Sequence, residues 1–287
     1  MYQLFLLFPS VLSIFFSLLL IYKYIEAKGD HYMPGNKQLN QGQIDILKTI
    51  YKFRFGTRDL IAASLSKQNG NPIYSRLSIL EERDVLARRY NSSYKLRGRA
   101  AEYYLTPSGL RTLRTQTELD GLDDRAIKAS YKDKNASDGF IRRCLTIFAL
   151  SNHLEHAYAG LQTFTKRELP EYDYFPAQLP DIFVSYKTEA GTKHFFIELF
   201  TEDTPSFAAD RRLRQLIKYY EDDEWSVTEM PFPTILCVGE NANVEKRLRK
   251  QIARALNRAD SHIEFCAVNM ATLLKATKEI ELDTLGR

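Results

Sequence analysis

Two acidic residues, Asp181 and Glu198, are the first candidates for chemistry in this sequence. Asp181 follows Pro180 and precedes an apolar run over residues 182–186, while Glu198 lies within a second apolar run over residues 194–200. The glycine-containing segment 188–192 separates the runs, which predicts a hairpin of two paired strands. Such a hairpin can bring the two acids together, and carboxylate oxygens are the ligands that Mg²⁺ prefers. The alternative is a structural role, with Asp181 as a cap at the start of a strand and Glu198 as a surface carboxylate.

The segments around this hairpin predict an α/β (α+β) domain with a mixed sheet over residues 139–287. Periodic apolar residues indicate helices over 140–161, 210–220, 244–258 and 271–278. Short apolar runs over 234–238 and 263–268 indicate two further strands.

This order of a helix, Pro-Asp, a hairpin, a Glu-containing strand and a helix resembles the core of PD-(D/E)XK nucleases. The resemblance implies that Asp181 and Glu198 hold Mg²⁺ for phosphodiester cleavage. It also implies a lysine two positions after the glutamate, where this chain has Phe200. The departure leaves a degenerate, non-cleaving core as an open alternative. Four residues could complete the site, three as replacement cations and one as an acid from the first helix: Arg212, Arg214, Lys218 and Glu155.

Residues 40–116 predict a winged helix-turn-helix. Three amphipathic helical segments are followed by a strand over 85–90, a polar basic tip over 91–99 and a return strand over 103–105. A helix of this unit can enter the major groove of DNA while basic residues of the wing neutralise phosphates. The candidate DNA-contacting residues are Tyr74, Ser75, Arg76, Lys95, Arg97 and Arg99. A solvated basic face on a protein-binding winged helix is the alternative.

The charge distribution agrees with this division. The formal net charge of the 287 residues is +4. Residues 42–116 carry 14 Lys and Arg against 6 Asp and Glu, whereas residues 168–230 carry 6 against 14. We therefore expect a polyanion such as double-stranded DNA at the first region, and a concentration of carboxylates in the second.

The N-terminal segment, residues 1–33, contains 19 uncharged residues from Leu4 to Tyr22. This length suffices for a membrane-spanning helix, and the lysines that follow would leave the rest of the chain in the cytoplasm, tethered to the inner face of the membrane. A start at Met33 is the alternative. Residues 117–138 predict a linker, and three widely spaced cysteines predict buried free thiols.

Taken over residues 40–271, the chain resembles the replication-relaxation family of plasmids and integrative elements. The resemblance rests on the order of the winged helix, the Pro-Asp hairpin ending in Phe-Ile-Glu-Leu, and the Arg-rich helix with Lys218-Tyr219-Tyr220. It implies a DNA-binding role in plasmid replication or DNA relaxation, alongside replication or transfer proteins. Members often have Glu-x-Asp where this chain has Glu198-Leu199-Phe200. The alternatives are a Mg²⁺-dependent endonuclease and a membrane-tethered transcriptional regulator.

Overall fold

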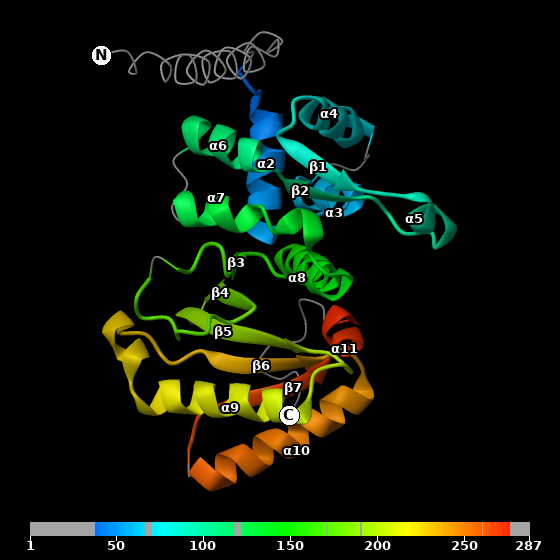
Figure 1. Ribbon diagram of the computed structural model, residues 1–287. Helices are drawn as coiled ribbons and strands as arrows, with labels where there is room; N and C mark the ends of the chain where they lie inside the picture. Colours follow the sequence, from blue (N-terminus) through cyan, green and yellow to red (C-terminus); the bar gives the residue numbers. More distant parts are fainter. Residues whose placement is uncertain are drawn as a thin grey trace, which may run out of the picture. The chain divides into compact units, whose positions relative to one another are not determined.

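A three-helix unit with a two-stranded wing opens the described part of the computed structural model (Figure 1). The structure describes residues 38–66, 71–117, 122–170, 172–189, 191–259 and 261–275. The predicted membrane segment, residues 1–33, lies outside the described residues. Within those residues, no helix is both long and apolar enough to cross a membrane.

The N-terminal unit has the element order of a winged helix. Its helices are α2 (Gln41–Phe53), α3 (Arg58–Ser64) and α4 (Asn71–Glu82), followed by the antiparallel strands β1 (Leu86–Arg89) and β2 (Glu102–Leu105) and by α6 (Pro107–Gln116). The hydroxyl of Thr57 accepts a hydrogen bond from the Leu60 backbone N–H and caps α3. The wing tip is not an open loop, because it contains the short helix α5 (Ser92–Leu96).

The predicted linker also contains regular structure. Residues 117–138 include α7 (Asp124–Ser130) and the 3₁₀ turn η1 (Asp133–Asn135). Leu122, Ala126 and Ile127 are buried there. The described residues of this segment, from Leu122 onward, therefore pack against their neighbours.

The C-terminal half is built around a five-stranded mixed sheet in the order β3-β4-β5-β6-β7. Its elements are α8 (Asp138–Ala157), β3 (Leu161–Thr165), β4 (Ile182–Thr188), β5 (Gly191–Phe200), α9 (Ser206–Glu221), η2 (Glu224–Thr228), β6 (Thr234–Gly239), α10 (Ala242–Ala259), β7 (Phe265–Asn269) and α11 (Met270–Lys275). The first three strands are antiparallel, while β5, β6 and β7 are parallel. The mixed α/β domain is confirmed, and β3 is a strand that the sequence did not predict.

Helices cover both faces of this sheet. Leu150 and Leu154 of α8 pack with β-strand residues such as Ile197 on one face. On the other face, α9 and α10 pack against alternate residues of the same strands, including Phe196 (Figure 1). The alternation follows from the two-residue period of a strand, and it places adjacent residues of β5 in separate cores. All three cysteines are buried free thiols, as predicted.

The edge strand β3 meets side chains along its outer edge. Lys52 of α2 donates a hydrogen bond to the Thr163 carbonyl at 2.5 Å. The Thr163 N–H donates to Glu155 at 3.0 Å, and the Thr165 N–H donates to Glu168 at 2.8 Å.

The ring of Phe53 stacks on Phe148 of α8 at 4.0 Å between centroids. The winged helix and the sheet domain therefore share contacts within one compact unit that begins at Gln41.

Gly109 marks the closest backbone approach in the winged helix, which leads to a first prediction. A Cβ at this position would lie 1.9 Å from the Val85 carbonyl oxygen, so the backbone at the base of the wing would have to move. We expect Gly109→Ala to lower the free energy of unfolding by about 1–3 kcal/mol, as overpacking does. Urea unfolding measures this value.

The matched control is Gly139→Ala. Gly139 lies in the first turn of α8, and a Cβ there would meet nothing within 4 Å. Alanine at a helical position with open space is expected to raise stability by about 0.4–1 kcal/mol. Equal effects of the two substitutions would contradict the close approach at Val85.

Candidate functional site

Asp181 is buried directly before β4 and has three polar partners. Lys166, one residue beyond β3, lies 2.9 Å from Oδ1, and Arg143 of α8 forms an ion pair with the same carboxylate. The Leu199 backbone N–H donates to Oδ2 at 2.8 Å. The carboxylate is only 1% exposed, so these partners replace its water.

Glu198 is buried on β5 and has a different cation. Arg212 of α9 forms an ion pair with Glu198 and also donates to the Gln178 carbonyl at 2.7 Å. Both side chains are almost fully buried. The ion pair therefore fixes the position of α9 on the sheet and its rotation about the helix axis.

The strand register explains why these two acids are near each other in the sheet but have different partners. The Asp181 N–H donates to the carbonyl of Ile197, next to Glu198, which confirms that the hairpin brings the two residues together. Glu198 has the same parity in β5 as Phe196 and Phe200, so its side chain lies on the α9 face. Asp181 meets α8 and the end of β3 instead.

The two carboxyl groups have opposite pKa shifts. Burial alone would raise the pKa of Asp181, but the positive charges of Arg143 and Lys166 and the Leu199 N–H outweigh it, and the pKa is lowered. Burial raises the pKa of Glu198 above its ordinary value although Arg212 opposes the shift. Asp181 is therefore held as the anion, and Glu198 is the carboxyl group that takes up a proton more easily.

The donor set does not suit Mg²⁺ in this arrangement. Both oxygens of Asp181 are engaged by Arg143, Lys166 and a backbone N–H, and Oε1 of Glu198 is engaged by Arg212. Three cationic side chains thus surround two carboxylates, which disfavours a further divalent cation. Among the residues that the structure describes, no group of three or more His, Cys, Asp or Glu side chains could hold a metal ion.

Three of the predicted site residues lie elsewhere. Lys218 is exposed and pairs with Asp222 at 2.7 Å, while Arg214 faces α10 in a groove with Arg254. Glu155 is twelve positions beyond Arg143 on α8, which is about 18 Å along the helix axis. Only Arg212, of the three predicted cations, meets either carboxylate.

The sequence prediction missed Arg143 and Lys166. Both are cations within a helix or turn, and neither follows the spacing of the nuclease motif. Lys166 could have been found only by predicting β3, because that strand ends at Thr165 and presents the next side chain to Asp181.

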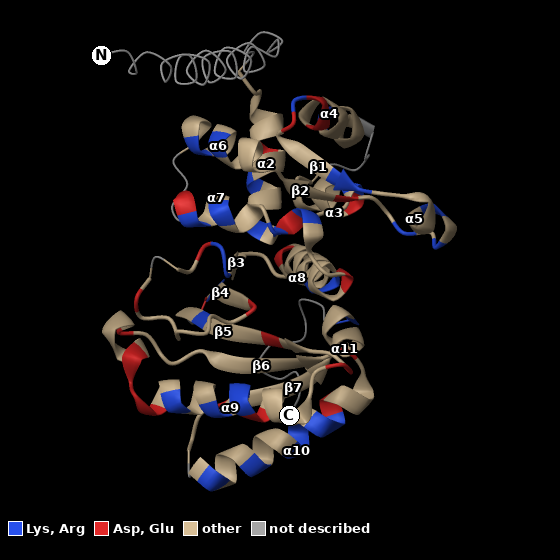
Figure 2. Cartoon of the chain, viewed as in Figure 1, with Lys and Arg blue, Asp and Glu red and all other residues tan. Residues whose placement is uncertain are grey.

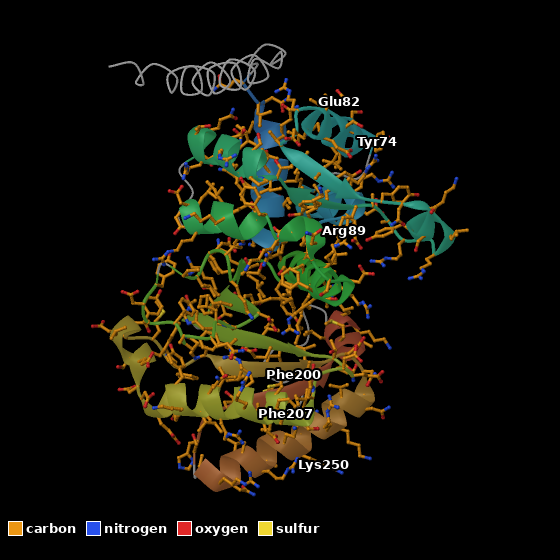
Figure 3. All side chains as sticks on the ribbon, viewed as in Figure 1. Tyr74, Glu82, Arg89, Phe200, Phe207 and Lys250 are labelled. Carbon is orange, nitrogen blue, oxygen red and sulfur yellow. The ribbon has the colours of Figure 1, made fainter. Side chains whose placement is uncertain are left out.

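The six predicted DNA-contacting residues divide into two groups. Tyr74 on α4 is half exposed (Figure 3), and Lys95 and Arg97 are exposed at the wing tip. Arg99, in contrast, pairs with Glu102 at 2.7 Å and Asp138 at 3.1 Å. It is therefore a structural cation that joins the wing to the start of α8.

The other two predicted residues of α4 are Arg76 and Ser75. The Arg76 guanidinium lies over Gly42 of α2, because a Cβ there would be 2.5 Å from its Nη1. Ser75 is exposed but also takes part in an interaction. Figure 2 shows further Lys and Arg positions, in blue, along α10.

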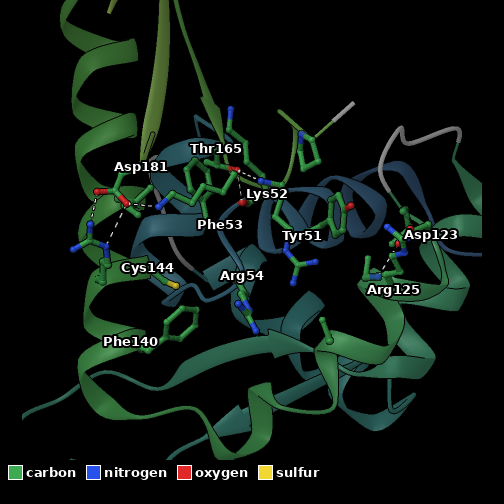
Figure 4. Close-up of a pocket in the computed structure, with 18 residues that line it drawn as sticks. Tyr51, Lys52, Phe53, Arg54, Asp123, Arg125, Phe140, Cys144, Thr165 and Asp181 are labelled. Atoms are coloured by element: carbon green, nitrogen blue, oxygen red, sulfur yellow. Dashed lines mark hydrogen bonds and ion pairs between the residues drawn. The ribbon is translucent and has the colours of Figure 1, made fainter. Parts of the chain in front are cut away.

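A basic cleft of about 860 Å³ opens beside Asp181. Its walls come from the end of α2, α7, the start of α8 and the segment after β3 (Figure 4). It has six basic lining residues against two aspartates, and the basic residues are Lys52, Arg54, Arg125, Arg143, Lys166 and Arg167. Cys144 also lines it, and burial raises the pKa of this thiol to about 11, so the group is protonated at neutral pH.

The fold combines a unit with the element order of a winged helix and a mixed α/β domain in which Phe200 stands two positions after Glu198. The model of the replication-relaxation family matches residues 47–226, and the chain belongs to that family. The matched region includes the winged helix from within α2 onward, Asp181, Glu198 and Arg212.

Two solved structures are similar to this chain over much of its length. Restriction endonuclease FokI has 12% identity and a TM-score of 0.31, with 83% of this chain and 45% of that chain covered. The same enzyme bound to DNA has 11% identity and a TM-score of 0.28, with 84% and 44% covered. This chain therefore spans less than half the length of those chains. No curated protein sequence matches it.

The buried pair of Glu198 and Arg212 gives a second prediction. Arg212→Ala leaves an unpaired carboxyl group in the core, and breaking a buried pair in this way costs about 3–5 kcal/mol of unfolding free energy. Arg211→Ala, at the exposed neighbouring position of the same helix, is the matched control and should change it by less than about 0.5 kcal/mol. Chemical denaturation followed by circular dichroism compares the two, and equal losses would contradict the assignment.

Proposed function

We propose that this protein binds DNA in the replication or relaxation of a mobile element. In this proposal the winged helix supplies the affinity, and the nuclease-like half holds DNA without cleaving it. The observation that carries the proposal is the wing tip, where Lys95 and Arg97 are exposed and form no ion pair with any described residue. Membership of the replication-relaxation family supports the same class of role.

The wing tip suits a phosphate-contacting element. Asn91 caps α5, and Tyr94 is buried against Glu102 through a hydrogen bond of 2.8 Å, so the tip has a fixed shape. Lys95 and Arg97 project from this short helix into solvent. Exposed cations on a rigid support can displace the counterions of a DNA backbone without first breaking an internal pair.

The nuclease-like core favours holding over cleavage because of its charge arrangement. Phe200 occupies the position of the motif lysine and is buried in the core beneath α9. The carboxylates that the motif assigns to Mg²⁺ are engaged by Arg143, Lys166 and Arg212. Such a site attracts the phosphate groups of DNA more readily than a free divalent cation.

A third prediction tests the wing. Replacing Lys95 and Arg97 together with alanine should weaken binding to duplex DNA and reduce the slope of log K against log salt by about two, because each phosphate contact contributes about one. Fluorescence anisotropy over a salt series measures both quantities. The matched control replaces the exposed residues Lys134 and Lys187 with alanine, which removes the same number of positive charges away from the wing.

Arg99→Ala provides a further comparison for the wing. Because Arg99 is paired with Glu102 and Asp138, this substitution should lower thermal stability and leave the salt slope unchanged. A double variant of Lys95 and Arg97 that binds with the parental affinity and slope would refute the proposed role of the wing.

A fourth prediction tests cleavage. Supercoiled plasmid incubated with the protein and Mg²⁺ or Mn²⁺ should remain supercoiled, as judged by agarose gel electrophoresis. Metal-dependent nicking that Asp181→Asn and Glu198→Gln both abolish would overturn the non-cleaving role and establish a metal-dependent endonuclease. Nicking that persists in both variants would come from another source, so the variants are purified in parallel.

A further inference from the structure

The cleft beside Asp181 contains a cation that forms no direct ion pair with any described residue. Arg167 follows Lys166 at the end of β3, is half buried, and forms no ion pair with any described residue. Its guanidinium carbon lies 5.6 Å from the centre of the Tyr51 ring. Burial lowers the pKa of Arg167, and the positive charge of Arg54 lowers it further.

The neighbouring cations of the cleft have carboxylate partners. Arg54 pairs with Asp133 at 2.6 Å, and Lys52 lies 3.6 Å from Glu168. Arg143 and Lys166 pair with Asp181. Arg125 is the other lining cation for which no ion pair with a described residue is found. Two arginines of one cleft are thus left to meet an anion from outside the protein.

The shape of the cleft limits the size of that anion. A volume of about 860 Å³ lies within the range of pockets that hold small ligands, which a duplex greatly exceeds. Phe140 contributes a partly exposed aromatic ring to the same wall, with Arg54 at 4.6 Å from its centre. A single-strand binding site typically combines arginines that bind phosphates with aromatic rings on which bases stack.

We propose that this cleft binds nucleotides of a single DNA strand, with Arg167 and Arg125 on the phosphates and Phe140 against a base. The inference rests on the proposed DNA-binding function but places the contact far from the basic wing tip in sequence and on different elements. The proposal also explains why an arginine without an ion-pair partner stands at position 167. A half-buried guanidinium without an ion-pair partner is less favourable in the free protein than one that a bound anion neutralises.

The test compares Arg167→Met with Arg211→Met in the full chain. Methionine keeps much of the length and apolar volume of the arginine stem and removes the charge. We expect Arg167→Met to weaken binding of a short fluorescein-labelled oligothymidylate about tenfold, the loss of one charge-assisted contact. Arg211→Met, on the exposed side of α9, should bind the strand like the parent.

Thermal unfolding separates a ligand contact from a structural role. Because Arg167 lacks a counter-ion, Arg167→Met should raise the Tm by about 2 °C while it weakens strand binding. An unchanged affinity for the oligothymidylate, or a lowered Tm, would overturn the proposal.

Two further arms distinguish this site from the wing and from a free-nucleotide site. Arg167→Met should still bind duplex DNA like the parent, and the double variant of Lys95 and Arg97 should still bind the oligothymidylate. Loss of both ligands in both variants would overturn the separate cleft. Thymidine monophosphate should displace the labelled oligothymidylate only weakly. If it competes as well as an unlabelled strand does, the cleft binds a free nucleotide, and the proposal of a single-strand site is overturned.

Discussion

The burial of two acidic side chains is the constraint on which the arrangement of the C-terminal half depends. A carboxylate without water or a counter-ion in a protein interior costs several kcal/mol, so each acid requires a cation at a fixed place. Arg143 meets this requirement for Asp181 from α8, and Arg212 meets it for Glu198 from α9. The two helices on opposite faces of the sheet are thus held by a charge directly before β4 and a charge on β5.

The same constraint explains how this core can keep the expected order of elements while its two acidic side chains have cationic partners. The order needs the hairpin, the two helices and apolar residues of the right parity, and all of these are present. A Mg²⁺-dependent reaction also needs open carboxylate oxygens, whereas here both oxygens of Asp181 and Oε1 of Glu198 meet guanidinium or ammonium groups. The fold alone therefore does not determine which chemistry these side chains support.

The sequence predicts the elements with strong local signals and misses those that depend on distant contacts. The wing and the hairpin follow from turn residues and apolar periodicity, and the structure contains them. The strand β3 is short and mixes polar with apolar residues, so pairing with β4 determines it. Because β3 was missed, Lys166 was missed as well.

Side-chain direction was the second gap between sequence and structure. The parity of β5 follows from its alternating pattern, so the direction of Glu198 could have been predicted. Asp181 lies just outside β4, where no strand period determines its direction, and only the position of α8 decides its partner. Arg99 shows the same difficulty, because its pairing with Asp138 joins residues 39 positions apart.

The side chains along β3 have a consequence for assembly. An open strand edge offers unpaired N–H and carbonyl groups on which another chain can add a strand. Here Lys52, Glu155 and Glu168 occupy the outward groups of Thr163 and Thr165. At the opposite edge, Arg249 donates to the Ala267 carbonyl of β7 at 2.9 Å. Charged side chains of the protein thus occupy backbone groups at both borders of the sheet, which disfavours the addition of a strand from another copy at those groups.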